Sequence, residues 1–335
     1  MKKFLFSVLA VGAIVACTKS EVKYAGETEI AFAPVASVAT KANVMHAIER
    51  TEYPVNETFK VFAYWQLLDA GTDHSAFNDA AEYIQGKEFA KSVDGPLWRG
   101  AAKPYYWPKT GSMVFACLSP ADVNVLSFSH DVVADKFTFV YTSPMVDGKI
   151  NTAETIDLMW TDATNSFDEK TATNGVPVTF KHALTWITFK VLGDEVTSGG
   201  NFVINSITMN DVIQAGKFTS DNRKWTKNDF GTTLPVFSGA RNLTTEPAVI
   251  ENVDRGTLII PQVKEDSDLT DYTATIEFTN NLGDTVLNEV VTVNLGREWE
   301  IGKHYIYTIK FTTTEILIEP HMEDWVEVNK ETQIL

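Results

Sequence analysis

Short runs in which apolar and polar residues alternate are the feature that most restricts the fold of this chain. Residues 272–278, YTATIEF, place Tyr, Ala, Ile and Phe on one face and Thr, Thr and Glu on the other. This period of two is typical of a strand with one buried face. Residues 305–311 repeat the pattern, and residues 59–65 and 137–141 are similar β-type runs. The pattern predicts sheets that each bury one face.

Helical periodicity is scarce along the chain. Only residues 74–85 are predicted to form a short helix, and the strand-like runs are separated by Gly, Asn and Pro turns. Such runs favour β-sandwiches over α/β folds. A polar cluster at residues 161–175 precedes a predicted strand pair within residues 178–191. We therefore predict an all-β chain with an N-terminal domain of residues 29–174 and a C-terminal domain of residues 175–335.

The N-terminal residues indicate export. The chain opens with Met-Lys-Lys and then stays apolar through Val15, which is the arrangement of a signal peptide. The apolar run is shorter than the ~20 residues of a membrane-spanning helix. Residues 14–17, Ile-Val-Ala-Cys, resemble a bacterial lipobox, in which Cys17 would take the lipid that anchors the protein to a membrane. We predict a signal peptide over 1–16 and a lipidated linker over 17–28; the alternative is an ordinary secretory signal with a chance cysteine.

Charge and motif content argue against nucleic-acid binding and catalysis. The net charge is −16 and no basic cluster occurs, whereas nucleic-acid binding depends on Lys and Arg that neutralise phosphates. No metalloprotease, nucleophile-elbow, phosphate-binding or dinucleotide-binding motif is present, so no enzyme activity and no cofactor are predicted. His321 lies near Glu323 and Asp324, but the histidines and cysteines lack metal-ligand spacing, so no metal is predicted. Cys117, in an apolar run, is predicted to be a buried, inert thiol.

Aromatic residues leave two interpretations open. Trp98, Tyr105, Tyr106 and Trp107 cluster in one region, and Trp225 lies further along the chain. If exposed, such rings would stack on sugars, as in a glycan-binding surface lipoprotein of the outer membrane. If buried, they belong to the core of a sandwich. The flanking prolines favour the second interpretation, because they suggest a fixed loop folded over a sheet.

Several short segments occur in a definite order across nearly the whole chain after Cys17. They are EIAFAPV at 29–35, ATKA at 39–42, FKVFAY at 59–64, YYWP at 105–108, VFA at 114–116, DLM at 157–159, FKHAL at 180–184, ITFKV at 187–191, GKHY at 302–305 and EDW at 323–325. In order and spacing these segments resemble the fimbrillin-like (Mfa-like) lipoproteins of Bacteroidales, the subunits of type V pili.

The resemblance implies a fold and a mode of assembly. It implies two tandem transthyretin-like β-sandwich domains in a structural and adhesive subunit, exported as a lipoprotein and displayed on the outer membrane. A trypsin-like surface protease would cut after a basic residue and release the first strand together with the lipid. A strand from another pilus subunit would then fill the groove left behind, which is a form of β-augmentation.

Carried onto this sequence, the removable first strand comprises Glu29, Ile30, Ala31, Phe32, Ala33, Pro34 and Val35. Two basic residues follow it, and both Lys41 and Arg50 are candidates for the cleavage site. Lys41 fits the spacing of the family better, whereas Arg50 suits an arginine-specific protease.

The donor strand is expected from the C-terminal region, with Ile316, Leu317 and Ile318 as candidate residues. Only the segment 326–335 follows Trp325, which is short for a subunit that must extend a strand into its neighbour. A tip, anchor or accessory subunit is therefore an alternative to a stalk subunit.

Overall fold

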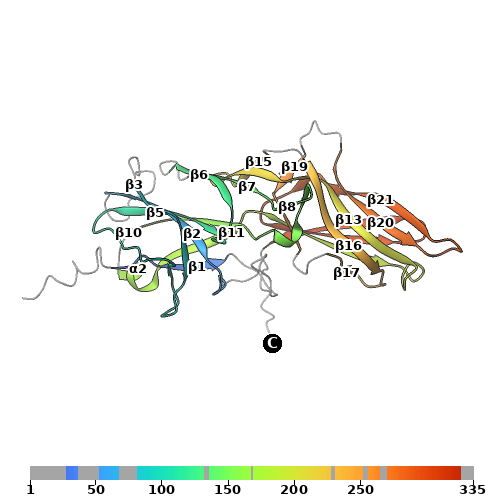
Figure 1. The fold of residues 1–335 in the computed structure, drawn as a ribbon, viewed down its shortest axis with the longest axis horizontal. Helices are drawn as coiled ribbons and strands as arrows, with labels where there is room; N and C mark the ends of the chain where they lie inside the picture. The colour runs from blue at the N-terminus through green and yellow to red at the C-terminus, as the bar shows by residue number, and fades with distance from the viewer. Residues whose placement is uncertain are drawn as a thin grey trace, which may run out of the picture.

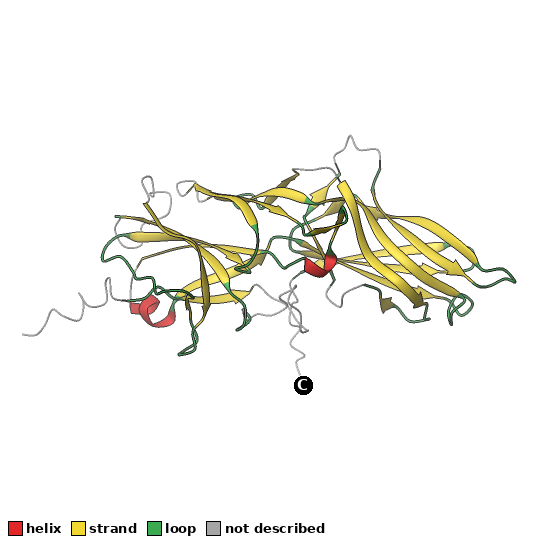
Figure 2. Ribbon diagram, viewed as in Figure 1, coloured by secondary structure: helices red, strands yellow, loops and turns green. Residues whose placement is uncertain are grey.

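The fold consists almost entirely of β-strands (Figures 1 and 2). The computed structural model describes residues 28–36, 53–67, 81–131, 136–166, 169–227, 231–251, 256–264 and 270–325. Within them lie one short α-helix, α2 (Glu169–Asn174), and one 3-10 turn, η2 (Thr152–Glu154). No helix in these ranges combines the length and apolar character that crossing a membrane requires. The all-β prediction is thus confirmed.

Seven strands close a barrel. Its order is β1 (Phe32–Ala36), β11 (Val176–His182), β10 (Met159–Ser166), β5 (Ser112–Ser119), β2 (Phe59–Gln66), β3 (Ala81–Lys91) and β4 (Trp98–Gly100). β1 runs parallel to β11, and the other neighbours are antiparallel. The interior is filled largely by aromatic rings, among them Phe32, Phe59, Phe89, Phe115 and Phe180.

A four-stranded sheet packs on the outside of this barrel. Its order is β15 (Lys224–Lys227), β14 (Ala215–Thr219), β7 (Lys136–Thr142) and β6 (Val125–Asp131). β5 is buried throughout, because its alternate residues face the two cores on either side of its sheet. Phe115 and Cys117 belong to the barrel interior, and Ala116 and Leu118 belong to the core beneath the outer sheet. The thiol of Cys117 is fully buried, as predicted.

The last part of the chain forms a two-sheet sandwich. One sheet has the order β17 (Ala248–Val249), β12 (Thr185–Gly193), β23 (Lys303–Phe311) and β24 (Ile316–Asp324), and β18 (Thr257–Ile259) also pairs with β12. The other has the order β16 (Gly231–Asn242), β13 (Phe202–Ile213), β20 (Tyr272–Asn280) and β21 (Leu287–Gly296). Inward residues of both sheets, such as Phe189 and Ile276, share one core. The strands predicted at 59–65, 137–141, 272–278 and 305–311 are all present.

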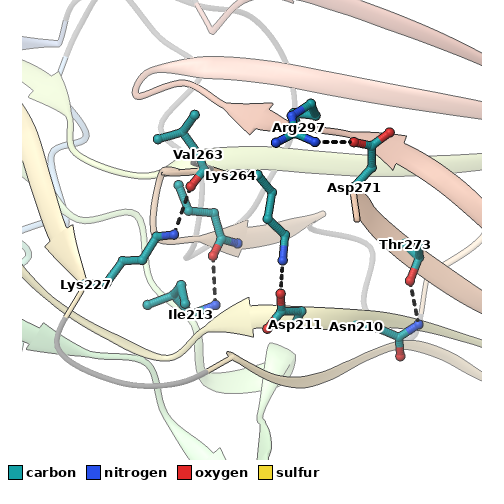
Figure 3. A network of polar contacts seen from close by, with 10 residues as sticks. Asn210, Asp211, Ile213, Lys227, Val263, Lys264, Asp271, Thr273 and Arg297 are labelled. Carbon is teal, nitrogen blue, oxygen red and sulfur yellow. Dashed lines mark hydrogen bonds and ion pairs between the residues drawn. The ribbon is translucent and has the colours of Figure 1, made fainter. Parts of the chain in front are cut away.

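Two-stranded ribbons and a polar network connect these sheets. The ribbons are β8 (Met145–Val146) with β9 (Lys149–Ile150), and β19 (Gln262–Val263) with β22 (Glu298–Trp299). Figure 3 shows the network around β19, in which the Lys227 ammonium donates to the Val263 carbonyl at 2.9 Å. The side chain of Gln262 accepts from the Ile213 amide at 2.9 Å, and Lys264 pairs with Asp211. The end of the outer sheet is thereby joined to the sandwich.

One detail of the sequence prediction is wrong, and the polar stretch 161–175 is more ordered than its composition indicates. Residues 81–85 belong to strand β3 and not to a helix, and residues 74–80 lie outside the described residues. The polar stretch 161–175 contains the end of β10, which continues through Ser166, and then α2. The expected domain boundary between residues 174 and 175 falls between β10 and β11, which are neighbours in the barrel. A division of the chain along its sheets would therefore assign β11 to the N-terminal part.

Candidate functional site

The predicted first strand is present and lies in the wall of the barrel. Glu29 forms a bridge to Tyr106, and regular strand β1 then runs from Phe32 to Ala36. Its neighbours, β11, β4 and the loop at residues 105–107, all follow it in the sequence by more than sixty positions. A strand thus lies within and just after the residues 29–35, and its removal stays a prediction.

The backbone of β1 is paired unequally on its two sides. On one side it pairs with β11 over its whole length, from Phe32 with Val176 to Ala36 with Phe180. On the other side it pairs with β4 only at Phe32, which lies opposite Trp98. Within the described residues no strand covers that side beyond Phe32. Pro34, which has no amide hydrogen to donate, suits such a half-open position.

The segment just before β1 is held by a loop. The Ile30 amide donates to the Tyr105 carbonyl at 2.7 Å, and the Trp107 amide donates to the Thr28 carbonyl at 2.9 Å. Arg99 also pairs with Glu29, with Nη1 and Oε2 2.8 Å apart. Both side chains of this ion pair are partly exposed, so it contributes at most ~1 kcal/mol.

Burial of Phe32 is the main attachment of β1. The ring is fully buried and meets three phenylalanines edge-on, with centroid distances of 5.2 Å to Phe89, 5.2 Å to Phe115 and 5.7 Å to Phe59. Burying such a side chain contributes roughly 1.5–3 kcal/mol, and edge-to-face contacts add about 0.5–1.5 kcal/mol each. Ile30 is also fully buried in the same cluster. A strand that replaced β1 would need apolar side chains at these two positions.

The groove also fits the backbone of β1 closely. The Val176 amide donates to the Ala31 carbonyl at 2.8 Å. Gly175 precedes it with φ +74°, and a Cβ there would lie 3.0 Å from the carbonyl carbon of Phe32. Only glycine combines this left-handed conformation with so close an approach. The wall of the groove is therefore shaped to accept an extended chain.

Tyr53, the first described residue after β1, is firmly anchored in the barrel. Its hydroxyl lies 3.0 Å from the Thr58 carbonyl, to which it donates, and 2.8 Å from Ser119 Oγ. Its ring stacks on Phe180 at 4.9 Å, and burial raises the pKa of its hydroxyl well above the usual range. Residues 37–52 are thus the sole covalent link between β1 and the rest of the barrel.

The lipidation and cleavage residues fall outside the described residues. Cys17 precedes them, and Lys41 and Arg50 both lie between the end of β1 and Tyr53. They are the two Lys or Arg residues of that interval. The geometry of their surroundings is therefore not described, and their roles stay predictions.

The candidate donor residues lie in β24, in a different sheet from β1. Ile316 and Ile318 are half-buried against the sandwich core, whereas Leu317 is 40% exposed. β24 pairs along its whole length with β23, from Phe311 with Ile316 to Lys303 with Asp324. In the described part of the chain, no strand pairs with its other side. The structure does not bring the predicted first and donor strands together.

Immediately after β24, Trp325 anchors the end of that strand. The residue is 1% exposed, and its amide donates to the Gly302 carbonyl at 2.9 Å. Its ring stacks on His182 with a centroid distance of 3.9 Å, and Asp157 lies 2.9 Å from His182 Nδ1. His182 ends β11, so the last described residue rests on the strand that also holds β1.

A second stacked pair adjoins Trp325. Trp186 lies 3.7 Å from His304, centroid to centroid, and 5.8 Å from Trp325. His304 is hydrogen-bonded to Glu323 and to Thr188, both at 3.0 Å. Burial lowers the pKa of His304 to about 4, although Glu323 acts in the opposite direction. The sequence analysis did not predict this cluster. The FKHAL and EDW segments, which contain His182 and Trp325, were interpreted only as features of the family.

The aromatic residues considered for glycan binding are mostly inside the protein. Trp98 and Trp107 are buried in the barrel cluster, and Tyr105 packs against it. Trp225 is half-buried, and its indole donates to the Ala183 carbonyl at 2.7 Å. Tyr106 is exposed. The core interpretation is confirmed for the two tryptophans, which cannot stack on an external sugar.

Comparisons with known proteins agree with this architecture. A crystal structure of a fimbrial protein from Bacteroides vulgatus is similar with a TM-score of 0.64 and 15% identity, over 89% of this chain and 100% of that one. A candidate cell adhesion protein from Bacteroides ovatus gives a TM-score of 0.53 and 14% identity, over 90% of this chain and 99% of that one. No curated protein matches the sequence. A model of the fimbrillin-like family matches residues 38–325, so the chain belongs to the fimbrillin-like family.

Proposed function

We propose that the protein is a non-enzymatic, structural and adhesive subunit of a cell-surface fimbrium, assembled by protease-triggered strand exchange. Membership of the fimbrillin-like family supports the fimbrial role. The observation that carries the mechanism is the position of β1, which is buried in the barrel yet linked to it only through residues 37–52.

A single cut is sufficient to make β1 a separate peptide. Any cut between Ala36 and Tyr53 leaves β1 attached to the N-terminal segment and held in the barrel by non-covalent contacts alone. A trypsin-like surface protease has Lys41 and Arg50 as targets in this interval. Cuts nearer the N-terminus, for example after Lys23, would leave β1 joined to the barrel.

Loss of β1 would leave the barrel open and would favour the binding of a replacement strand. The β11 edge would expose unpaired backbone groups, and the rings of Phe59, Phe89 and Phe115 would face solvent. Unpaired backbone groups and exposed aromatic surface are both unfavourable, so an extended apolar segment of another subunit would bind there. Before cutting, β1 itself prevents premature assembly.

The anchoring of β24 supports a tip or accessory position in the fimbrium. Donation of Ile316, Leu317 and Ile318 would break the entire ladder with β23 and withdraw Trp325 from its buried site. A subunit that accepts a strand and keeps its own is suited to an end or side position. The proposed anchor before processing is a lipid on Cys17 in the outer membrane.

Sequencing the N-terminus of the protein in isolated fimbriae tests the mechanism. We expect a start at Ala42 or Thr51, and we expect Lys41→Gln with Arg50→Gln to keep the protein uncut and unassembled. Lys103→Gln, an exposed lysine of the barrel, is the matched control and should leave assembly unchanged. Assembled protein that begins at Cys17 would show that cutting is not required.

The lipid anchor needs a separate test. Cells grown with labelled palmitate should label the wild-type chain and not Cys17→Ala. We expect the variant to be released from membranes while its barrel remains folded. Label on the variant would place the lipid elsewhere.

A further inference from the structure

Two segments of this chain have similar sequences, and one of them occupies the groove that holds β1. Residues 28–34 are TEIAFAP, and residues 314–320, where β24 begins, are TEILIEP. The two segments share Thr, Glu, Ile and Pro, and they differ at the three positions between Ile and Pro. These three positions decide which of the two segments the groove can hold.

The first contact that the groove makes is with a carboxylate. Glu29 pairs with Arg99, and Nη1 and Oε2 are 2.8 Å apart. Loop 99–109 contains three basic residues and no acidic residue, although the net charge of the chain is −16. A carboxylate is therefore favoured over an ammonium group at this position, but only weakly, because both side chains of the pair are partly exposed. Glu315 of the second segment meets this condition as well as Glu29 does.

The groove has no room for a large side chain at Ala31, which is 2% exposed. The carbonyl of Ala31 accepts from the Val176 amide at 2.8 Å, and the preceding amide, of Ile30, donates to the Tyr105 carbonyl at 2.7 Å. These bonds fix the backbone on both sides, so a larger side chain would have to displace the groups that cover Ala31. The counterpart in the second segment is Leu317, which is 40% exposed in β24.

The next position favours an aromatic ring. Phe32 is fully buried and meets three phenylalanines edge-on, at centroid distances of 5.2–5.7 Å. The counterpart is Ile318, whose smaller side chain would leave part of this space empty and would lose the edge-to-face contacts. In its own sheet, Ile318 is only half-buried against the sandwich core.

The third differing position is tolerant. Ala33 is half-buried and lies opposite Pro177, which is exposed. Glu319, its counterpart, can extend from there into solvent. The groove therefore discriminates at two of the three differing positions, and at both of them it favours residues 28–34 over residues 314–320.

We infer that the groove selects a strand of a different fimbrial subunit, one with an acidic, an aliphatic, a small and an aromatic residue at the four positions 29–32, and disfavours β24 of a second copy of this chain. The inference rests on the strand exchange proposed above and names the chemistry of the strand that is exchanged. A chain whose groove disfavours its own β24 does not polymerise by itself. This behaviour agrees with the tip or accessory position proposed for the protein.

Substitutions in the uncut chain test the selectivity without any exchange, because β1 itself occupies the groove. We expect Ala31→Leu and Phe32→Ile each to lower the urea concentration at the midpoint of unfolding. Ala33→Leu adds the same side chain as Ala31→Leu at the tolerant position, so it should lower the midpoint less. An equal loss for the two leucine variants would overturn the requirement for a small residue, and an unchanged midpoint for Phe32→Ile would overturn the requirement for an aromatic one.

Peptide exchange on the trypsin-cut wild-type chain tests the partner directly and does not require Ala31→Leu to fold. Synthetic peptides of residues 28–36 and 314–322 compete for the groove, and native mass spectrometry records which peptide is bound. We expect the peptide 314–322, and the peptide 28–36 that carries Ala31→Leu, to need at least about ten-fold higher concentrations than the peptide 28–36. Equal binding of the peptides 28–36 and 314–322 would overturn the inference, and so would fibres formed by the cut chain alone.

A charge reversal tests the role of Arg99 in the same assay. The wild-type chain should prefer the peptide 28–36 with Glu at its second position over the same peptide with Lys there, and Arg99→Glu should reverse this preference. An unchanged preference would remove Arg99 from the selection. If no peptide exchanges, including 28–36 itself, strand exchange is rejected, and the midpoints of the uncut variants still decide which residues the groove accepts.

Discussion

The first and the last described strands of this protein are held in opposite ways. β1 is short and paired on one side for most of its length, but its Phe32 and the preceding Ile30 are fully buried. β24 is nine residues long and fully paired with β23, but its side chains are half-buried or exposed. Side-chain burial therefore holds β1, whereas a backbone ladder and the single anchor Trp325 hold β24. Under the proposed strand exchange, a strand with similar apolar side chains would replace β1, whereas β24 would stay in place.

The largest expected effect is on the side-chain attachment of β1. Phe32→Ala should lower the free energy of unfolding by about 3–5 kcal/mol, because it leaves a cavity among three phenylalanine rings. Leu317→Ala in β24 is the matched control and should cost less than ~1 kcal/mol, since that side chain is 40% exposed. Urea unfolding measures both values. Equal losses would remove the contrast between the two strands.

Removal of Trp325, the anchor of β24, should cause the next largest loss in the free energy of unfolding. Trp325→Ala should cost about 3 kcal/mol, and it should leave the ladder with β23 formed but prone to opening. Hydrogen exchange should accelerate in the amides of residues 316–324 while those of β11 stay protected. If β11 opens to the same extent, the anchor serves the whole molecule and not the last strand.

Acid should weaken the cluster beside Trp325 through His304. Its folded pKa of about 4 lies below the unfolded value near 6.5, so the unfolded state takes up the proton first. The neutral form therefore contributes stability at neutral pH, and about 2–3 kcal/mol is lost as the pH falls from ~6.5 to ~4.

Urea unfolding across this pH range, repeated with His304→Gln, isolates that contribution. The groups that face the ring are Glu323, Thr188, Lys190 and His321, and they remain in the variant. We expect a flatter pH profile for His304→Gln. A profile that superimposes on the wild-type profile would assign the acid sensitivity to other groups.

The smallest effect concerns the ion pair ahead of β1. Glu29→Gln should cost less than ~1 kcal/mol, because Glu29 and Arg99 are partly exposed. The double variant with Arg99→Gln measures the coupling, which should shrink in high salt. A coupling above ~2 kcal/mol would make charge, and not the burial of Phe32, the main attachment of this segment.

The alternating runs predicted strands correctly, because a strand with one buried face requires apolar and polar residues to alternate along a short segment. Residues 272–278 and 305–311 are clear examples, and both are strands. Residues 81–85 were mistaken for helix because β3 buries only Ile84 and Phe89 and contains Gly86 at φ +56°. Its strand conformation comes from pairing with β2, which is tertiary information.

Contacts between segments far apart in the sequence could not be predicted from the pattern of apolar and polar residues. β7 pairs with β14, which follows it by some seventy residues, and no local feature of either strand specifies that partner. The parallel pairing of β1 with β11 and the stacking of Trp325 on His182 depend on the closed topology. The cleavage and lipidation residues lie outside the described residues, so their assignment rests on sequence alone.

The most direct test of strand exchange follows the fate of β1 itself. The uncut chain is treated with limiting trypsin, and native mass spectrometry records whether the peptide that contains Phe32 stays with the barrel. We expect this peptide to remain bound after the cut and to leave when another subunit or its strand peptide is added, so that every assembled copy lacks Phe32. Assembled copies that still contain the Phe32 peptide would contradict replacement of β1 by a strand of another subunit.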